Sequence, residues 1–232
     1  MELIWDGIKH AVWLLVSGDP EVLQITLLSL QISGVATLLS LAVGIPLGTL
    51  FALGRFPGRS VVISLVNTGM GLPPVVVGLF VSILLWRGGP LGALELLYTP
   101  AAIGIAQFII AAPIVTGLTL AAVQQIPREF RLQMLGLGAS RPQMLWVLIK
   151  EARLPMLAAL MAGFGGVISE VGASMMVGGN IKGHTRVLTT ATVLETSKGN
   201  FDIAIALSLI LLGITFLVNW ALTWIQQRRR PS

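Results

Sequence analysis

The sequence contains no cysteine, and only 11% of its 232 residues are charged. Without cysteine, the chain can form neither a disulfide framework nor a thiolate metal site. Soluble domains carry roughly 25% charged residues, so this low charge, together with a mean hydropathy of +0.88, indicates an integral membrane protein. The two histidines, His10 and His184, lie far apart in the sequence, which argues against a histidine-based metal centre.

Three other protein classes are also disfavoured by the sequence. There is no G-x-x-x-x-G-K-[ST] phosphate loop, so the chain is not itself an ATPase. No nucleophile–base or metal constellation is present, which disfavours a membrane enzyme. The sequence pI near 10.5 would suit a nucleic-acid partner, but the basic residues lie in short connections between apolar runs. We therefore expect no nucleic-acid partner.

Several apolar runs are long enough to cross a bilayer, which takes about 20 residues per helix. Four runs without charge cover residues 22–54, 60–86, 96–127 and 203–227. The fifth, 154–181, contains a single ionisable residue, Glu170. The sequence therefore predicts an all-α membrane protein with five transmembrane helices, in one domain covering residues 21–227.

An amphipathic segment precedes the first span. Its apolar side chains recur at helical spacing, at Ile4, Ile8, Val12 and Leu15. Trp5 and Trp13 are typical of the headgroup level of a membrane. We therefore predict that residues 1–20 form a helix on the membrane surface, or alternatively that they pack as a short extra helix.

The basic residues predict the orientation of the chain. Ten lie in one set of connections: Arg55, Arg59, Arg128, Arg131, Arg141, Lys150, Arg153, Arg228, Arg229 and Arg230. Five lie in the other set: Lys9, Arg87, Lys182, Arg186 and Lys198. Because cytoplasmic loops carry the excess of positive charge, we expect the N-terminus outside and the C-terminus inside. Residues 228–232 would form a basic cytoplasmic tail that contacts anionic lipid.

Prolines and one acid mark irregular points within the spans. Pro46, Pro73, Pro74 and Pro113 are each predicted to interrupt a helix, which at membrane depth requires another partner for the freed carbonyls. An acid inside a span is costly. Glu170 could pair across a dimer or with another helix, hydrogen-bond freed backbone, or line a translocation pathway; we favour a hinge or gate contact.

A long cytoplasmic connection, residues 124–154, reads as helix, turn, helix. The turn Leu137-Gly138-Ala139-Ser140 and the apolar helix after it resemble the cytoplasmic coupling loop of ABC importer permeases. Gly138 and Leu148 stand at the glycine and isoleucine of that family's pattern. The sequence departs from its E-A-A and L-P positions, which hold Leu132, Gln133, Met134, Lys150 and Glu151.

Other segments strengthen this resemblance. The sequences LPPVVVG at 72–78 and SEVGASMMVGGNI at 169–181 look like segments of molybdate-type permeases. The sequences KEAR at 150–153, TRVLTTA at 185–191 and LETSKGNF at 194–201 are similar to the tungstate-type permeases of this group, which are related to sulfate permeases.

The resemblance implies a type I, binding-protein-dependent ABC importer permease with the MetI-like fold. It implies a homodimer in the inner (cytoplasmic) membrane, two ATPase subunits that bind ATP and Mg²⁺, and an extracytoplasmic binding protein that delivers the oxyanion. The implied substrate is tungstate, with molybdate or another oxyanion as the alternative. This chain would bind no cofactor. A stand-alone secondary transporter is less favoured, because Glu170 is the only charge in the spans.

The resemblance also assigns the candidate residues for coupling to the ATPase. They are Gly138, Ala139, Ser140, Arg141 and Arg131. Small residues let a turn enter a cleft of a partner, and Ser140 can cap the following helix. An ordinary helix–helix turn with solvated arginines is the alternative interpretation.

Two further groups are candidates for the transport pathway. For a gate we select Glu170, Met175, Met176, Pro73 and Pro74, with core packing as the alternative for the methionines. For docking of the binding protein we select Lys182, His184, Arg186 and Lys198, in the outer connection 178–200. Their positive charge would attract an oxyanion or an acidic protein surface, and an ordinary exposed loop is the alternative.

Overall fold

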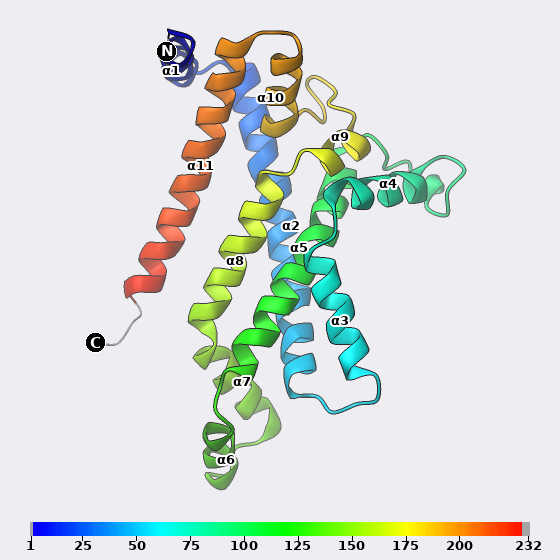
Figure 1. Cartoon of the computed structure of the whole chain (residues 1–232), viewed down its shortest axis with the longest axis vertical. Helices are drawn as coiled ribbons and strands as arrows, with labels where there is room; N and C mark the ends of the chain where they lie inside the picture. The colour runs from blue at the N-terminus through cyan, green and yellow to red at the C-terminus, as the bar shows by residue number, and fades with distance from the viewer. Residues whose placement is uncertain (1, 229–232) are drawn as a thin grey trace.

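The computed structural model describes residues 2–228, and the regular elements among them are all helical (Figure 1). Three helices are long and apolar enough to cross a membrane alone: α2 (Pro20–Leu53), α5 (Pro100–Gln124) and α11 (Phe201–Arg228). Two further spans are bent pairs: α3 (Arg59–Met70) with α4 (Pro74–Leu85), and α8 (Arg153–Ile168) with α9 (Gly172–Gly178). The five predicted spans are thus confirmed if each bent pair counts as one.

The shorter elements gather at the two ends of the bundle. They are α1 (Glu2–Ser17), the 3-10 turn η1 (Gly92–Leu94), α6 (Arg128–Gly136), α7 (Arg141–Glu151) and α10 (Leu188–Ser197). Helices α6 and α7 form the predicted helix–turn–helix at one end, and α1 and α10 lie at the other (Figure 1). The outer connection therefore contains a helix, α10, that the sequence analysis did not predict. Arg229 and Arg230 of the predicted tail lie outside the described residues.

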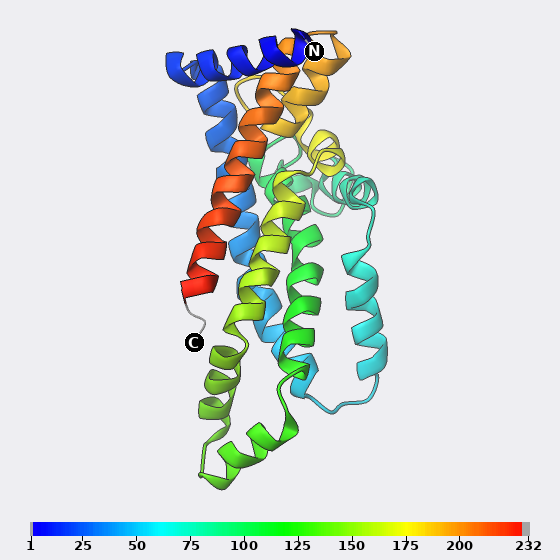
Figure 2. The ribbon, with the colours of Figure 1, turned by 60° about the vertical axis from the view of Figure 1, so that its left-hand side comes forward.

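Helix α1 lies across the end of the bundle rather than along it (Figure 2). It packs mainly against α11, and its buried residues are Gly7, Ala11 and Leu14. Ile8 and Val12 of the predicted apolar stripe remain exposed, while the side chains of Ile4 and Leu15 lie outside the description. The alternative of packing as a short extra helix is thus confirmed. The location on the membrane surface stays a prediction, and Ile8 and Val12 leave an apolar face turned outward.

The prolines differ in their effect on the helices. Pro46 and Pro113 lie inside the continuous helices α2 and α5, so the predicted interruptions at these two positions are wrong. One missing donor in a long helix leaves the turns on either side intact, and neighbouring groups can satisfy the freed carbonyl. Pro74 instead begins α4, where a missing N–H costs nothing. The predicted break at Pro73 and Pro74 is confirmed, with a bend of 102° between α3 and α4.

Helices α2 and α5 form the most extensive helix–helix contact in the described chain. Gly44 and Gly48 allow this close approach: a Cβ on Gly48 would lie 2.5 Å from the carbonyl oxygen of Thr116. Both glycines therefore serve the packing of α2 against α5. Helix α5 also contacts α3, α4, α8 and α9, so it forms the centre of the bundle.

This packing predicts opposite effects for two identical substitutions in α2. Gly48→Ala should lower the free energy of unfolding by about 1–3 kcal/mol, because the added Cβ overlaps the backbone of α5. Gly34→Ala is the control, since nothing lies within 4 Å of its added Cβ, and it should leave stability unchanged or raise it by about 0.4–1 kcal/mol. Denaturant unfolding of the detergent-solubilised protein measures both; equal stability of the two variants would contradict the packing.

Candidate functional site

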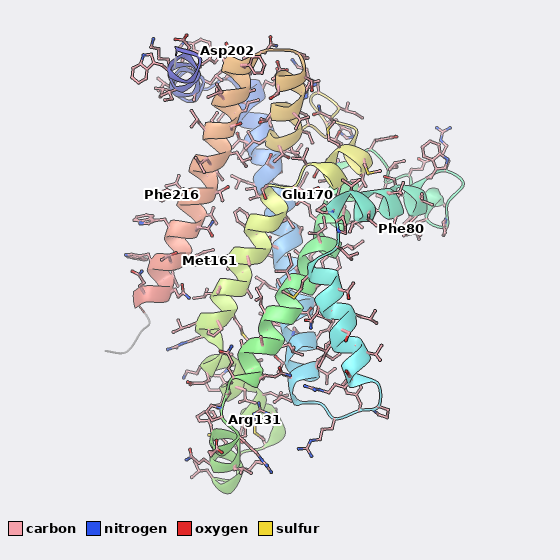
Figure 3. The ribbon with its side chains drawn as sticks, viewed as in Figure 1. Phe80, Arg131, Met161, Glu170, Asp202 and Phe216 are labelled. Carbon is pink, nitrogen blue, oxygen red and sulfur yellow. The ribbon has the colours of Figure 1, made fainter. Side chains whose placement is uncertain are left out.

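The fourth span is interrupted between α8 and α9, and Glu170 lies at this interruption (Figure 3). Helix α8 ends at Ile168, α9 begins at Gly172, and the two helices are bent by 56°. We call residues 169–171 the α8–α9 break. Backbone groups exposed at such a break must find partners within the protein, because the hydrocarbon core of a membrane contains no water to solvate them.

Glu170 supplies one of these partners. It is 6% exposed and is the only charged side chain that is buried among the described residues. Its Oε1 accepts a 2.8 Å hydrogen bond from the backbone N–H of Ala173, in the first turn of α9. In the part of the chain that the structure describes, no cation forms an ion pair with it. Of the roles left open by the sequence, the single chain supports hydrogen bonding to freed backbone.

Two residues from other helices complete the hydrogen bonding at the break. The Thr189 hydroxyl, on α10, donates to the carbonyl oxygen of Glu170 at 2.9 Å. The Gln107 amide, on α5, donates from Nε2 to the carbonyl oxygen of Val167 at 3.0 Å. Gln107 is 3% exposed and was missed by sequence reasoning. A polar amide in the otherwise apolar span 96–127 was the signal that could have identified it.

Helix α4 lies against α9, so the two irregular spans meet. A Cβ on Gly78 would lie 2.7 Å from the Cα of Ala173, and one on Gly172 would lie 2.7 Å from Cγ2 of Val75. The Sδ of Met176 lies 3.2 Å from the Cβ position of Gly78. The structure thus brings together Glu170, Met176 and the helix that starts at Pro74.

Met175 and Met176 differ in their surroundings. Met176 is half-buried at the α4–α9 contact, while Met175 is exposed. The two side chains therefore do not form a single plug within the described chain.

The candidate coupling turn, residues 137–140, lies at the opposite end of α5 (Figure 1). Gly138 has a φ of +80°, a conformation that favours glycine, and nothing lies within 4 Å of its Cβ position. Ser140 is the N-cap of α7, and its N–H donates to Oε1 of Gln143 at 2.8 Å. The predicted capping position of Ser140 is therefore confirmed. Gly138 and Ser140 are exposed, and Ala139 is half-buried.

The two coupling arginines are not equivalent. Arg131 of α6 donates from its guanidinium to the carbonyl oxygen of Val123, near the C-terminal end of α5, at 3.0 Å. This hydrogen bond connects α6 to α5, so the Arg131 side chain does not lie free in solvent (Figure 3). The side chain of Arg141 is outside the description. Three leucines, Leu132, Leu135 and Leu137, are exposed on α6 and the turn, which gives this end an apolar surface.

The outer connection carries cations that are largely neutralised within the chain. Lys182 and Arg186 both pair with Glu21 of α2, at 2.6 and 3.2 Å. Lys198 pairs with Glu195 at 2.8 Å. His184 is exposed. The predicted cationic surface is therefore a network of mixed charge, because acids from α2 and α10 stand next to its lysines and arginine.

Comparison with known proteins decides the family. Residues 44–231 match the family described as "Binding-protein-dependent transport system inner membrane component". This chain belongs to that family. The matched range contains every candidate residue for coupling, gating and docking, so these residues lie in the shared part of the permease.

Individual relatives are also similar to the permease. The tungstate uptake system permease protein TupB of Peptoclostridium acidaminophilum is 41% identical over 98% of this chain and 100% of that protein. A probable anion ABC transporter permease of Haloferax volcanii is 43% identical over 84% of this chain and 87% of that protein. The molybdenum transport system permease protein ModB of Escherichia coli K12 is 28% identical over 91% and 97%.

Solved structures support the fold of the permease. The MetNI methionine ABC transporter in an inward-facing conformation is similar with a TM-score of 0.73 and 19% identity, over 95% of this chain and 98% of that chain. A bacterial importer of alginate gives a TM-score of 0.76 and 17% identity, over 90% and 80%. The predicted MetI-like fold is thus confirmed. The chain is a multi-pass membrane permease of ABC importers, a family whose members work with ATPase and substrate-binding partners.

Because the Glu170 carboxylate accepts a hydrogen bond from Ala173, we expect different effects from two substitutions at Glu170. Glu170→Gln should retain assembly and transport, because its amide oxygen can still accept from Ala173. Glu170→Ala should lower transport by about tenfold, since it leaves a buried N–H without a partner. Substrate uptake by vesicles containing the assembled importer measures the difference.

Ser169→Ala is the control at the same break, because its exposed hydroxyl donates only to carbonyls of its own helix. It should transport as well as the wild type. Equal transport by the Gln and Ala variants of Glu170 would remove Glu170 from the mechanism.

Proposed function

We propose that this chain is the permease subunit of an ATP-driven importer of tungstate. The observation that carries the proposal is its 41% identity to a tungstate uptake permease along the full length of that protein. A second tungstate uptake permease, from Campylobacter jejuni, is 35% identical over 95% of this chain and 92% of that protein. Molybdate is the second candidate, supported by the lower identity to the E. coli molybdenum permease.

The assembly proposed for this importer contains two copies of this chain, two ATPase subunits and an extracytoplasmic tungstate-binding protein. ATP and Mg²⁺ would bind to the ATPase subunits, and this chain would bind no cofactor. The N-terminus would lie outside and the C-terminus in the cytoplasm. The positions of the arginines support this orientation, because α6, α7 and the α2–α3 connection lie together at the end opposite α1 and α10 (Figure 1).

The coupling turn would receive movement from the ATPase and pass it to α5. The exposed leucines and the Gly138 turn offer an apolar surface to a cleft in the partner. Arg131 connects this surface to the end of α5, and Gln107 connects α5 to the α8–α9 break. Helix α5 therefore joins the surface where force would be applied to the break that contains Glu170.

Reconstitution tests the function directly. The permease should import tungstate into proteoliposomes only when its ATPase, its binding protein and internal ATP are all present. Competition by molybdate at equal concentration measures the preference between the two oxyanions. Oxyanion transport by the permease alone would contradict the proposal, and ATP-driven import of molybdate but not tungstate would support the second candidate.

The same substitution at two glycines with similar positive φ, Gly138 and Gly58, tests the role of the Gly138 turn. Gly138→Val should abolish co-purification of the ATPase and ATP-dependent uptake, because a β-branched residue at a φ of +80° would reshape the exposed turn. Gly58→Val is the control: Gly58 has a φ of +78°, equally open surroundings, and a place in the other loop at this end.

The Gly58 variant should keep the ATPase bound. If both variants lose the ATPase, or both keep it, the Gly138 turn has no special part in coupling.

A further inference from the structure

A cavity of about 450 Å³ lies where α1, α2, α10 and α11 meet at the outer end of the bundle. It is separate from the α8–α9 break and from the coupling turn, because none of its lining residues belongs to either. Its wall holds three positive side chains, Lys182, Arg186 and Lys198, and three carboxylates, Asp19, Glu21 and Glu195. The cavity therefore combines strong local charges with no excess of either sign.

These charges are well defined in position. The side chains of Arg186 and Glu195 are only 15% and 14% exposed, and each has an ion-pair partner in the wall. Hydrogen bonds from Asn200 and Lys198 hold the pKa of the Glu195 carboxyl below its ordinary value, so this group is ionised at neutral pH. Asp19 is fixed by its 3.0 Å hydrogen bond from the N–H of Val22.

The rest of the wall is apolar. Leu14, Val22, Ile25, Ile203 and Leu207 line the cavity beside the charges. Helices α2 and α11 carry exposed apolar side chains further along their length, among them Leu23, Leu27 and Leu212. A ligand that fits this surface carries one positive and one negative group, and both are attached to a hydrocarbon chain.

The position of α1 places this cavity at the level of lipid headgroups. Helix α1 lies across the ends of the long helices (Figure 2), with Trp5 and Trp13 exposed. Exposed tryptophans on a helix parallel to the membrane surface are typical of the interface. Trp13 also lines the cavity, so the cavity faces the interface.

We propose that this cavity binds the headgroup of a zwitterionic phospholipid with a primary ammonium group, namely phosphatidylethanolamine. The lipid phosphate contacts the lysines and Arg186, and the ammonium donates N–H to the carboxylates. An anionic lipid or a free oxyanion could contact the three cations, but it would bring no positive group for the three carboxylates. A choline headgroup has no N–H to donate to the carboxylates, and the rings in the cavity wall are those of Trp13 and His10.

A bound lipid of this kind would join α1 to the outer connection. Residues of α1, of α2 and of the segment before α10 all line the same cavity. The headgroup thus adds contacts between segments that otherwise meet through a few side chains, such as the Lys182–Glu21 pair. The proposal concerns lipid binding and is independent of the substrate that the permease carries.

Native mass spectrometry of the full permease in detergent tests the proposal without any mutation. The probes are dioleoyl phosphatidylethanolamine, its N-methyl and N,N-dimethyl forms, phosphatidylcholine and phosphatidylglycerol. Retention should fall with each added methyl group, to about tenfold lower for phosphatidylcholine, because each methyl removes one charge-assisted hydrogen bond. Equal retention of the ethanolamine and choline lipids, or stronger retention of phosphatidylglycerol, overturns the proposal.

A competition arm separates a lipid from a free headgroup. Glycerophosphoethanolamine carries the same phosphate and ammonium but no acyl chain, so it should not displace the lipid at equal concentration. Displacement at equal concentration would overturn the assignment to a lipid.

Two double variants provide a matched comparison. Glu195→Gln with Lys198→Gln removes an ion pair between residues three apart in the cavity wall, with no change in net charge. Asp6→Asn with Lys9→Gln removes a pair of the same spacing that does not line the cavity. The first should lower retention of phosphatidylethanolamine by about tenfold and the second by less than about twofold. Equal retention by both variants contradicts the site.

Discussion

The backbone groups at the α8–α9 break must find hydrogen-bond partners inside the chain, because a membrane offers them no water. Three buried polar residues meet this requirement: Glu170 for the first turn of α9, Gln107 for the last turn of α8, and Thr189 for the break itself. Each comes from a different helix or segment. The break is therefore a fixed joint at which α5, α10 and the fourth span are tied together.

Two helices lead from this joint toward the two ends of the permease: α5 toward α6, and α10 toward the outer connection. Gln107 and Val123 lie about 24 Å apart along α5, taking the rise of a regular helix, and Val123 accepts the hydrogen bond from Arg131 of the coupling segment. Thr189 lies on α10, next to the outer connection. Helix α5 thus provides a continuous path of contacts between α6 and the α8–α9 break.

The sequence predicted the spans, the helix–turn–helix of α6 and α7 and the acid in the fourth span, because charge-free runs, helix-capping residues and an isolated acid are local signals. It did not predict that α4 turns by 102° from α3 and lies against α9, since that depends on the contacts of Gly78 with Ala173 and of Gly172 with Val75, which are distant in the sequence. It also missed Gln107, and it interpreted Lys182 and Arg186 as free cations. Their partner, Glu21, lies about 160 positions away in the chain, and sequence spacing carries no information about such a pair.

The most direct test of the joint is the exchange rate of a single amide. The N–H of Ala173 stands at the start of a helix, where amides ordinarily lack an intrahelical partner, yet it donates to Glu170. Hydrogen–deuterium exchange of the reconstituted permease, resolved to this residue, should show strong protection that is lost in Glu170→Ala and kept in Glu170→Gln. Exchange of the wild-type amide at the rate of an unbonded amide, with bilayer and partners present, would contradict the account.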